Sequence, residues 1–177
     1  MKAGKDYKIQ FAGLSTGEHT YEFEVGDKFF ENLEYSEIKK SSIHIDLILL
    51  KQSTMMMMEF KISGTVKMDC DLCNVEFDLP ISGEHKLIVK VGGHLTGDED
   101  DDIITVAANE HELDLSQYLY EYIALSLPIK RIHPPDAKGK STCDKEVLKK
   151  LKKFLTEKEK EDPEDPRWND LKNIKLN

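Results

Sequence analysis

Apolar and polar residues alternate over long stretches of the first 107 positions, a period of two that is typical of half-buried β-strands. Residues 5–11 and 19–25 both show this alternation, and a glycine-containing turn, GLSTGE, lies between them. Two alternating stretches that are joined by such a turn predict a β-hairpin at the start of the chain.

The alternation continues through the middle of the chain. Residues 43–49 place an apolar side chain at every second position, and residues 60–68 do the same, with Gly64 interrupting one face. The stretches VEFDLPI and EHKLIVKV predict two further strands joined at the dipeptide SG, so the motif CDLC at residues 70–73 lies at the tip of a hairpin. We therefore expect a largely antiparallel sheet over residues 5–107.

Two segments in the second half of the chain have helical periodicity. In ELDLSQYLYEYIALSLP, apolar side chains recur every three or four positions, with Asp114 placed to cap the helix and Pro128 to end it. The segment STCDKEVLKKLKKFLTEKEKE predicts a second helix with a narrow apolar stripe, capped by Ser141 or Thr142. The stretch IITVAA before them predicts one more strand.

These elements predict an α+β fold, with an antiparallel, partly barrel-like sheet followed by two helices and a C-terminal tail motif. We expect residues 1–156 to form one domain, and residues 157–177 to form a charged linker that carries the motif DPRW. Trp168 is the single tryptophan of the sequence, and we expect its side chain to dock either on this domain or on a partner protein.

The composition narrows the class of protein. A net charge of −9 argues against a nucleic-acid binder with a wholly basic surface, but it leaves room for RNA contact through one basic segment. Three cysteines do not make a disulfide framework, and the sequence has no apolar run of membrane-spanning length. We therefore expect a cytoplasmic protein with reduced thiols.

Charge is concentrated in two segments of opposite sign. Residues 98–102 are five consecutive acids, which predict a solvated loop. Clustered acids can also hold magnesium in a nuclease, but catalytic carboxylates normally converge from separate strands, so the contiguous run favours a loop without catalysis. Residues 130–153 contain nine basic residues against three acidic ones. Ordinary solvated surface is the alternative interpretation of both segments.

Cys70 and Cys73 form a CxxC motif, which is the strongest chemical signal in the sequence. Three interpretations stay open: half of a structural zinc site, two buried thiols in a turn, or a redox pair. A redox CxxC opens a helix, whereas the residues after Cys73, NVEFDLPI, are strand-like, and this counts against redox chemistry.

A zinc ion needs two more ligands beyond the CxxC motif. Cys143 is the remaining cysteine, and His133 precedes it by ten residues in the same irregular segment. The hypothesis is a structural zinc site made by Cys70, Cys73, His133 and Cys143, joining the sheet to the helical half of the chain. The histidines that could substitute for His133 or Cys143 are His44, His85, His94 and His111.

Several motifs in combination resemble one bacterial family. They are GTVKMDCDLCNVEFDLPISG, the acidic run that follows it, ELDLSQYLYEYIALSLPIKRIHP, and DPRWNDL. Over roughly residues 40–175 the chain resembles the YceD family, the large ribosomal RNA subunit accumulation proteins. The segment HPPDAKGKSTC is similar to the version found in Bacteroidetes-type bacteria. Each motif is weak by itself, and their combination is specific.

The resemblance implies a role in making or accumulating large-subunit ribosomal RNA, and it implies no enzymatic activity. We expect a non-enzymatic ribosome-biogenesis factor whose partner is large-subunit rRNA or a basic large-subunit ribosomal protein, without a membrane or small-molecule partner. The alternative is a protein–protein adaptor with a structural zinc site and no direct RNA contact. Candidate RNA-binding residues are Lys130, Arg131, Lys149, Lys150, Lys152 and Lys153. Candidate partner-binding residues are Asp98, Asp100, Asp101, Asp102 and Trp168.

Overall fold

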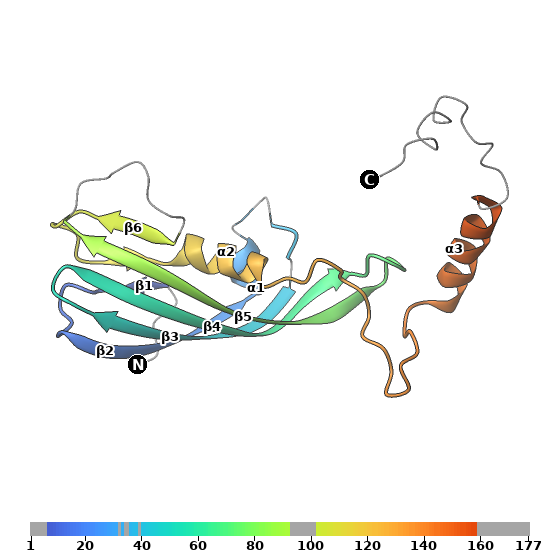
Figure 1. Ribbon diagram of the computed structural model, residues 1–177, viewed down its shortest axis with the longest axis horizontal. Coiled ribbons are helices and arrows are strands. Elements are labelled where there is room, and N and C mark those ends of the chain that lie inside the picture. The colour runs from blue at the N-terminus through green and yellow to red at the C-terminus, as the bar shows by residue number, and fades with distance from the viewer. Residues whose placement is uncertain (1–6, 32, 34–35, 39, 93–101, 159–177) are drawn as a thin grey trace, which may run out of the picture. The chain divides into compact units, whose positions relative to one another are not determined.

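The alternating stretches of the sequence form one five-stranded sheet in the computed structural model of the chain (Figure 1). The structure describes residues 7–31, 33, 36–38, 40–92 and 102–158. The strands of the sheet, in spatial order, are β2 (Gly17–Gly26), β3 (Lys40–Lys51), β4 (Met55–Asp69), β5 (Glu76–Val91) and β6 (Ile103–Val106). Strands β2 to β5 pair antiparallel, and β6 pairs parallel with β5.

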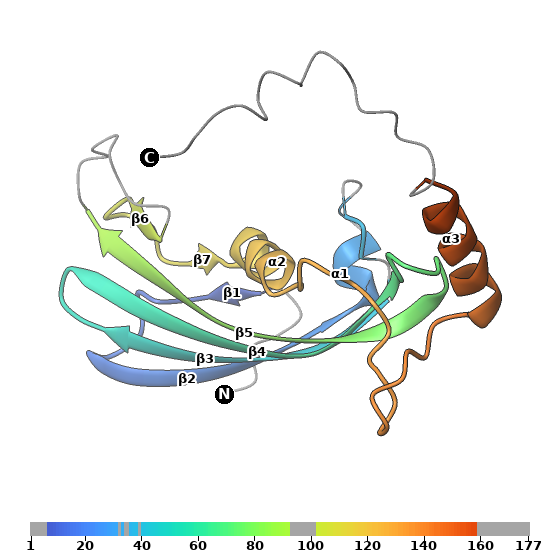
Figure 2. The same ribbon diagram turned by 45° about the vertical axis from the view of Figure 1, so that its right-hand side comes forward.

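The predicted α+β class is confirmed, with one correction to the shape of the sheet. The sheet is curved, but β2 and β6 lie at opposite ends of the strand order, so it is not closed into a barrel (Figure 2). The described residues group into two units. The first contains Met1–Asp69 and Glu76–Arg131, and the second contains Cys70–Val75 and Ile132–Asn177.

The predicted hairpin at the start of the chain is wrong. Strand β1 (Lys8–Ile9) pairs with β7 (Leu113–Asp114) in a separate two-stranded sheet, not with β2. The ammonium group of Lys51, at the end of β3, donates hydrogen bonds of 2.6 Å and 2.9 Å to the carbonyl oxygens of Phe11 and Leu14. These bonds fix the segment after β1 in a turn, and the alternation in residues 5–11 reflects burial of Ile9 and Phe11 in the core.

Strand β5 is longer than the sequence indicated. VEFDLPI and EHKLIVKV belong to one continuous strand, because Ser82 and Gly83 stay in the ladder opposite Ser63 and Ile62. A Cβ atom on Gly83 would overlap the hydroxyl oxygen of Ser126. Gly83 therefore marks a position where the end of α2 approaches the sheet closely. In the sequence, a glycine at such a position resembles a turn.

Helix α2 (Ser116–Leu125) covers the concave face of the sheet, next to β1, β7 and the short helix α1 (Asp27–Glu31) (Figure 2). It buries Leu119, Tyr122 and Ile123. The Tyr122 ring stacks on the imidazole of His85, with the centroids 4.6 Å apart, and its hydroxyl donates to the carbonyl of Lys86. The apolar face that the sequence predicted is thus the face that packs on the sheet.

The starts of both long helices differ from the sequence prediction. Asp114 belongs to β7 and accepts a hydrogen bond from the backbone N–H of Ser116, while Leu115 is the residue at the cap position of α2. Helix α3 (Lys145–Lys158) is capped by Asp144, which accepts hydrogen bonds of 2.8 Å and 3.0 Å from its first turn. Ser141 and Thr142 therefore lie before the cap, and do not form it.

The core of the first unit comes from the inward-facing positions of β2 to β5 and from α2. Its largest fully buried side chains are Phe23, Phe60, Ile9, Ile43, Ile45, Leu47, Leu49, Met56, Met58, Ile62, Leu87 and Leu115. Among the described residues, no helix is long and apolar enough to cross a membrane.

Candidate metal centre

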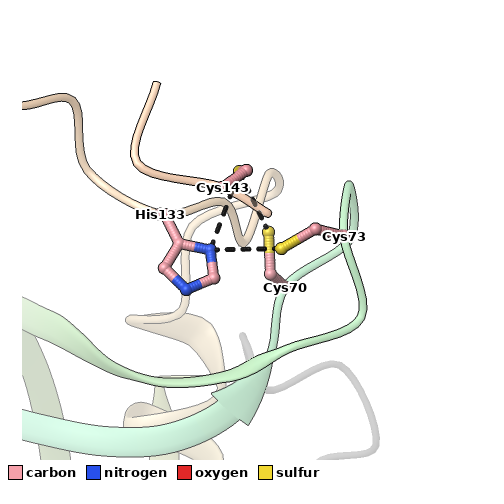
Figure 3. Close-up of side chains that lie close together, drawn as sticks. All are labelled: Cys70, Cys73, His133 and Cys143. Atoms are coloured by element: carbon pink, nitrogen blue, oxygen red, sulfur yellow. Dashed lines mark hydrogen bonds between the residues drawn. The ribbon is translucent and has the colours of Figure 1, made fainter. Parts of the chain in front are cut away.

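The hairpin tip between β4 and β5 positions Cys70 and Cys73, as the sequence predicted. The backbone N–H of Cys70 donates to the carbonyl of Val75 at 3.1 Å, and the N–H of Asn74 donates to the carbonyl of Cys70 at 2.8 Å. Asn74 has a φ of 56°, a left-handed conformation that asparagine tolerates better than most residues. This tight turn brings the two cysteine side chains to the same side (Figure 3).

The segment before α3 positions the other two candidate ligands. Asp136 organises a turn, because its carboxylate accepts hydrogen bonds from the backbone N–H groups of Lys138 and Lys140. The Thr142 hydroxyl then donates to the carbonyl of Pro134 at 2.8 Å. These bonds close the segment on itself, so that His133 at its start and Cys143 at its end lie beside each other.

All four predicted ligands meet in one place, which we call the cysteine–histidine cluster: Cys70, Cys73, His133 and Cys143. The Sγ atoms of Cys70 and Cys143 are 3.8 Å apart. The Nδ1 atom of His133 lies 3.5 Å from Sγ of Cys73 and 3.7 Å from Sγ of Cys143 (Figure 3). The four ligand atoms all lie within 4.8 Å of one another, and the three cysteines are free thiols.

Three of the six separations between the ligand atoms match the edges of a zinc tetrahedron. Zinc holds cysteine sulfur at about 2.3 Å and histidine nitrogen at about 2.05 Å, so tetrahedral angles place two sulfurs about 3.8 Å apart and a sulfur and a nitrogen about 3.5 Å apart. The three distances agree with these values within about 0.2 Å. The largest difference is for Nδ1 of His133 and Sγ of Cys143, which are 3.7 Å apart where about 3.5 Å is expected. The four ligand atoms all lie within 4.8 Å of one another, so the side chains can hold a tetrahedral ion once the longer separations close by about 1 Å.

The burial of the cluster indicates a closed site. Cys70, Cys73 and Cys143 expose 1%, 4% and 4% of their surface, and His133 is half-buried. Three sulfurs and one nitrogen fill the four positions of a tetrahedral ion, which leaves none for water or a substrate. Such a ligand set is typical of structural zinc, whereas catalytic zinc keeps one open position.

The pKa values of the Cys70 and Cys143 thiols are shifted in opposite directions. Burial opposes ionisation of the Cys70 thiol, but hydrogen bonds, chiefly from the backbone of Leu72 and Cys73, outweigh it and lower its pKa to about 6. Ser141 favours the thiolate of Cys143, but burial and the neighbouring thiols outweigh this effect and raise its pKa. Without metal, the cluster therefore favours a thiolate at Cys70 and a protonated thiol at Cys143.

The structure around the CxxC motif does not support the redox interpretation. No helix begins at the motif in the described structure, since the residues after Cys73 lead directly into β5. A redox CxxC relies on the dipole of such a helix to stabilise its thiolate. The stabilisation of the Cys70 thiolate comes instead from the N–H groups of the hairpin tip, a contribution that the sequence pattern did not reveal.

The candidate RNA-binding residues fall in different units. Lys130 and Arg131 end the first unit, and the guanidinium of Arg131 forms an ion pair of 2.8 Å with Glu37. The lysines of α3 belong to the second unit and are exposed: Lys149, Lys150, Lys152 and Lys153. The four candidate lysines of α3 are therefore exposed on one helix, and Lys130 and Arg131 belong to the other unit.

Most of the candidate partner-binding residues lie outside the part of the chain that the structure describes. Asp102 is exposed beside the start of β6. Asp98, Asp100, Asp101 and Trp168 lie outside the described residues. Partner binding by the acidic run and by the DPRW motif therefore stays a prediction from the sequence.

The four clustered residues also lie within the part of the chain that has a family match. The sequence profile of the family described as "Large ribosomal RNA subunit accumulation protein YceD" matches residues 58–175 of the 177-residue chain. The chain belongs to the YceD family. The YceD description names the accumulation of large-subunit ribosomal RNA and names no reaction, in agreement with the resemblance seen in the motifs. Comparisons with curated proteins and with solved structures gave no match.

Proposed function

We propose that this protein is a non-enzymatic factor that supports the accumulation or processing of large-subunit ribosomal RNA, and that its second unit is organised by a structural zinc ion. The family match supports the process. The observation that carries the zinc site is the convergence of three thiols and one imidazole nitrogen at tetrahedral distances. The closed ligand set gives the ion a structural role.

The proposed contact with ribosomal RNA is made by α3. Lys149, Lys150, Lys152 and Lys153 follow one another at spacings of one or two residues, so they lie on the side of the helix away from the apolar stripe. Lysine ammonium groups bind the phosphate backbone without base specificity, which suits a factor that holds or protects RNA. The acidic run with Asp102 is the proposed contact for a basic ribosomal protein.

A second candidate function is a protein–protein adaptor without RNA contact. The observation in its favour is the exposed apolar stripe of α3, where Phe154 and Leu155 expose 66% and 64% of their surface. A helix with such a stripe is typical of partners that lay a helix into an apolar groove. Pull-downs with and without nuclease distinguish the two, because partners held through RNA are lost after nuclease and adaptor partners are retained.

The zinc site is tested by the metal content of the untagged protein after native purification. We expect about one zinc per chain, lost in Cys70→Ser and in Cys143→Ser. His133→Asn should also lose zinc, while His111→Asn, an exposed histidine outside the cluster, is the matched control and should keep it. Zinc that survives both cysteine substitutions would refute the ligand set.

A further inference from the structure

The second unit has an unusual core. Within residues 70–75 and 132–155, where burial is described, the buried side chains are Cys70, Cys73 and Cys143. The apolar core of the protein is built from residues of the first unit. The interior of the described second unit therefore consists of groups that bind metal well and pack weakly, because thiols are small and form only weak hydrogen bonds.

Helix α3 shows the same lack of apolar support. Val147 and Leu148 are half-buried, and the apolar side chains after them lie on the surface: Leu151, Phe154 and Leu155 expose 36%, 66% and 64% of their area. An isolated helix of its 14 residues is marginal in water, since most helical stability in proteins comes from packing of an apolar face. What fixes α3 is its first turn, where the cap Asp144 directly follows Cys143 of the cluster.

From these two observations we propose that metal binding is what folds the second unit, so that metal occupancy switches the presentation of the α3 lysines to RNA. The inference rests on the proposed zinc site and RNA contact, and it adds their coupling. With zinc bound, the hairpin tip, His133 and Cys143 are joined through one ion, and the start of α3 is fixed. Without zinc, the same segments are held by a few hydrogen bonds of loop residues, and α3 frays.

The direction of the coupling follows from the ligands. A binding site assembled from two chain segments does not exist in the unfolded segment, so the free energy of metal binding becomes free energy of folding. Three thiolates and a neutral imidazole around a divalent ion carry one net negative charge beside the N-terminus of α3. That charge interacts favourably with the helix dipole and stabilises the first turn further.

Hydrogen exchange followed by mass spectrometry tests the folding step on the full chain. The protein is compared zinc-loaded, stripped with a chelator under a reducing agent, and reloaded with zinc, with metal content measured in each state. We expect amides of residues 70–75 and 145–158 to exchange at least tenfold faster when stripped and to recover on reloading. Amides of β3 and β4 are the internal control and should not change. Equal exchange of α3 with and without zinc would overturn the inference while leaving the zinc site intact.

Binding of a labelled fragment of large-subunit ribosomal RNA tests the switch. We expect stripped protein to bind at least tenfold more weakly than zinc-loaded protein, in parallel with the loss of α3 protection. If loaded protein binds RNA regardless of its α3 lysines, the proposed RNA contact and the switch are both refuted. If affinity follows those lysines but ignores zinc, the switch alone is refuted.

Variants separate the metal from the side chains that hold it. His133→Cys supplies a fourth thiolate and should retain zinc, α3 protection and RNA binding, whereas His133→Ala should lose all three. A His133→Cys protein that holds zinc yet leaves α3 unprotected would overturn the inference. A protein that takes up no zinc in any state would refute the site and the inference together.

Discussion

Cys70 and Cys143 stand 73 positions apart in the chain, yet their sulfur atoms are 3.8 Å apart. Residues 76–131 between them belong to the first unit, and a weak thiol–thiol interaction does not by itself hold the remaining segments together. A shared metal ion does, because each sulfur then forms a bond to the same centre. Cys70 and Cys143 are therefore the residues on which to test whether the cluster binds a metal or consists of buried thiols without one.

Cobalt substitution should report the ligand set directly. We expect cobalt(II) to bind in place of zinc with the absorption of a tetrahedral ion and an intense thiolate-to-metal charge-transfer band. Cys73→Ser should abolish this band, because a missing ligand costs the ion, while His133→Cys should strengthen it, because a fourth thiolate is gained. Absorption typical of six-coordinate cobalt in the unchanged protein would contradict the closed site.

Reversing the charge of the α3 lysines should change the salt dependence of RNA affinity. Each phosphate contact adds about 0.7 to the slope of log affinity against log salt for single strands, so losing four contacts should reduce the slope by about 3. The variant is Lys149→Glu, Lys150→Glu, Lys152→Glu and Lys153→Glu.

The matched control for this experiment is Lys90→Glu, an exposed lysine of β5 in the first unit. It should leave the slope unchanged, and far-ultraviolet circular dichroism checks that the α3 variant keeps its helix. An unchanged slope in the α3 variant would contradict direct phosphate contact and favour the adaptor function.

The pKa values of two histidines of the sheet should be shifted in opposite directions. A hydrogen bond with Glu24 is the main cause that raises the pKa of His44 above 6.5, whereas burial lowers the pKa of His85 below it. His44 therefore adds stability below pH 6.5 that is lost as pH rises through its folded pKa. His85 adds stability above pH 6.5 that is lost as pH falls through its folded pKa.

Nuclear magnetic resonance of the imidazole protons measures both values in one titration. Glu24→Gln should lower the pKa of His44 and leave that of His85 in place. Titration of His85 at or above 6.5 would contradict its position between the sheet and Tyr122.

Gly64 should tolerate no side chain. It lies opposite Ile43 in the β3–β4 ladder, and a Cβ atom there would overlap the carbonyl oxygen of Ser42 and lie 2.7 Å from the Cα of Ile43. Because these are backbone atoms of a central strand, Gly64→Ala should lower the free energy of unfolding by about 3 kcal/mol. Gly13→Ala has no atom within 4 Å and is the control, expected to be near neutral in urea unfolding.

The sequence predicted which four candidate ligands lie together better than it predicted the strand pairing. Cysteine and histidine are few in this chain, so a hypothesis about four ligands had few candidates to weigh, and the geometry brought the expected four together. Alternation, in contrast, identifies a strand but not its partner, which is why β1 was expected on β2 and lies on β7. Gly83 was misread because a glycine serves a close helix contact as readily as a turn.

The assignment of the second unit could not come from local pattern at all. The hairpin tip Cys70–Val75 directly connects β4 to β5, yet it is grouped with Ile132–Asn177. That grouping depends on contacts made 60 to 73 positions away along the chain. Propensity and periodicity describe a few neighbouring residues, so they carry no information about such contacts.

The discontinuous second unit also sets an order of events during synthesis. Strands β2 to β5 are complete once Val91 has been made, but Cys143 follows Cys70 by 73 residues. At about 5–20 residues per second, translation leaves the two cysteines of the tip without their partners for about 4–15 s. Once Val91 has been made, the nascent chain exposes these two thiols to any soft ion or oxidant until Cys143 is added.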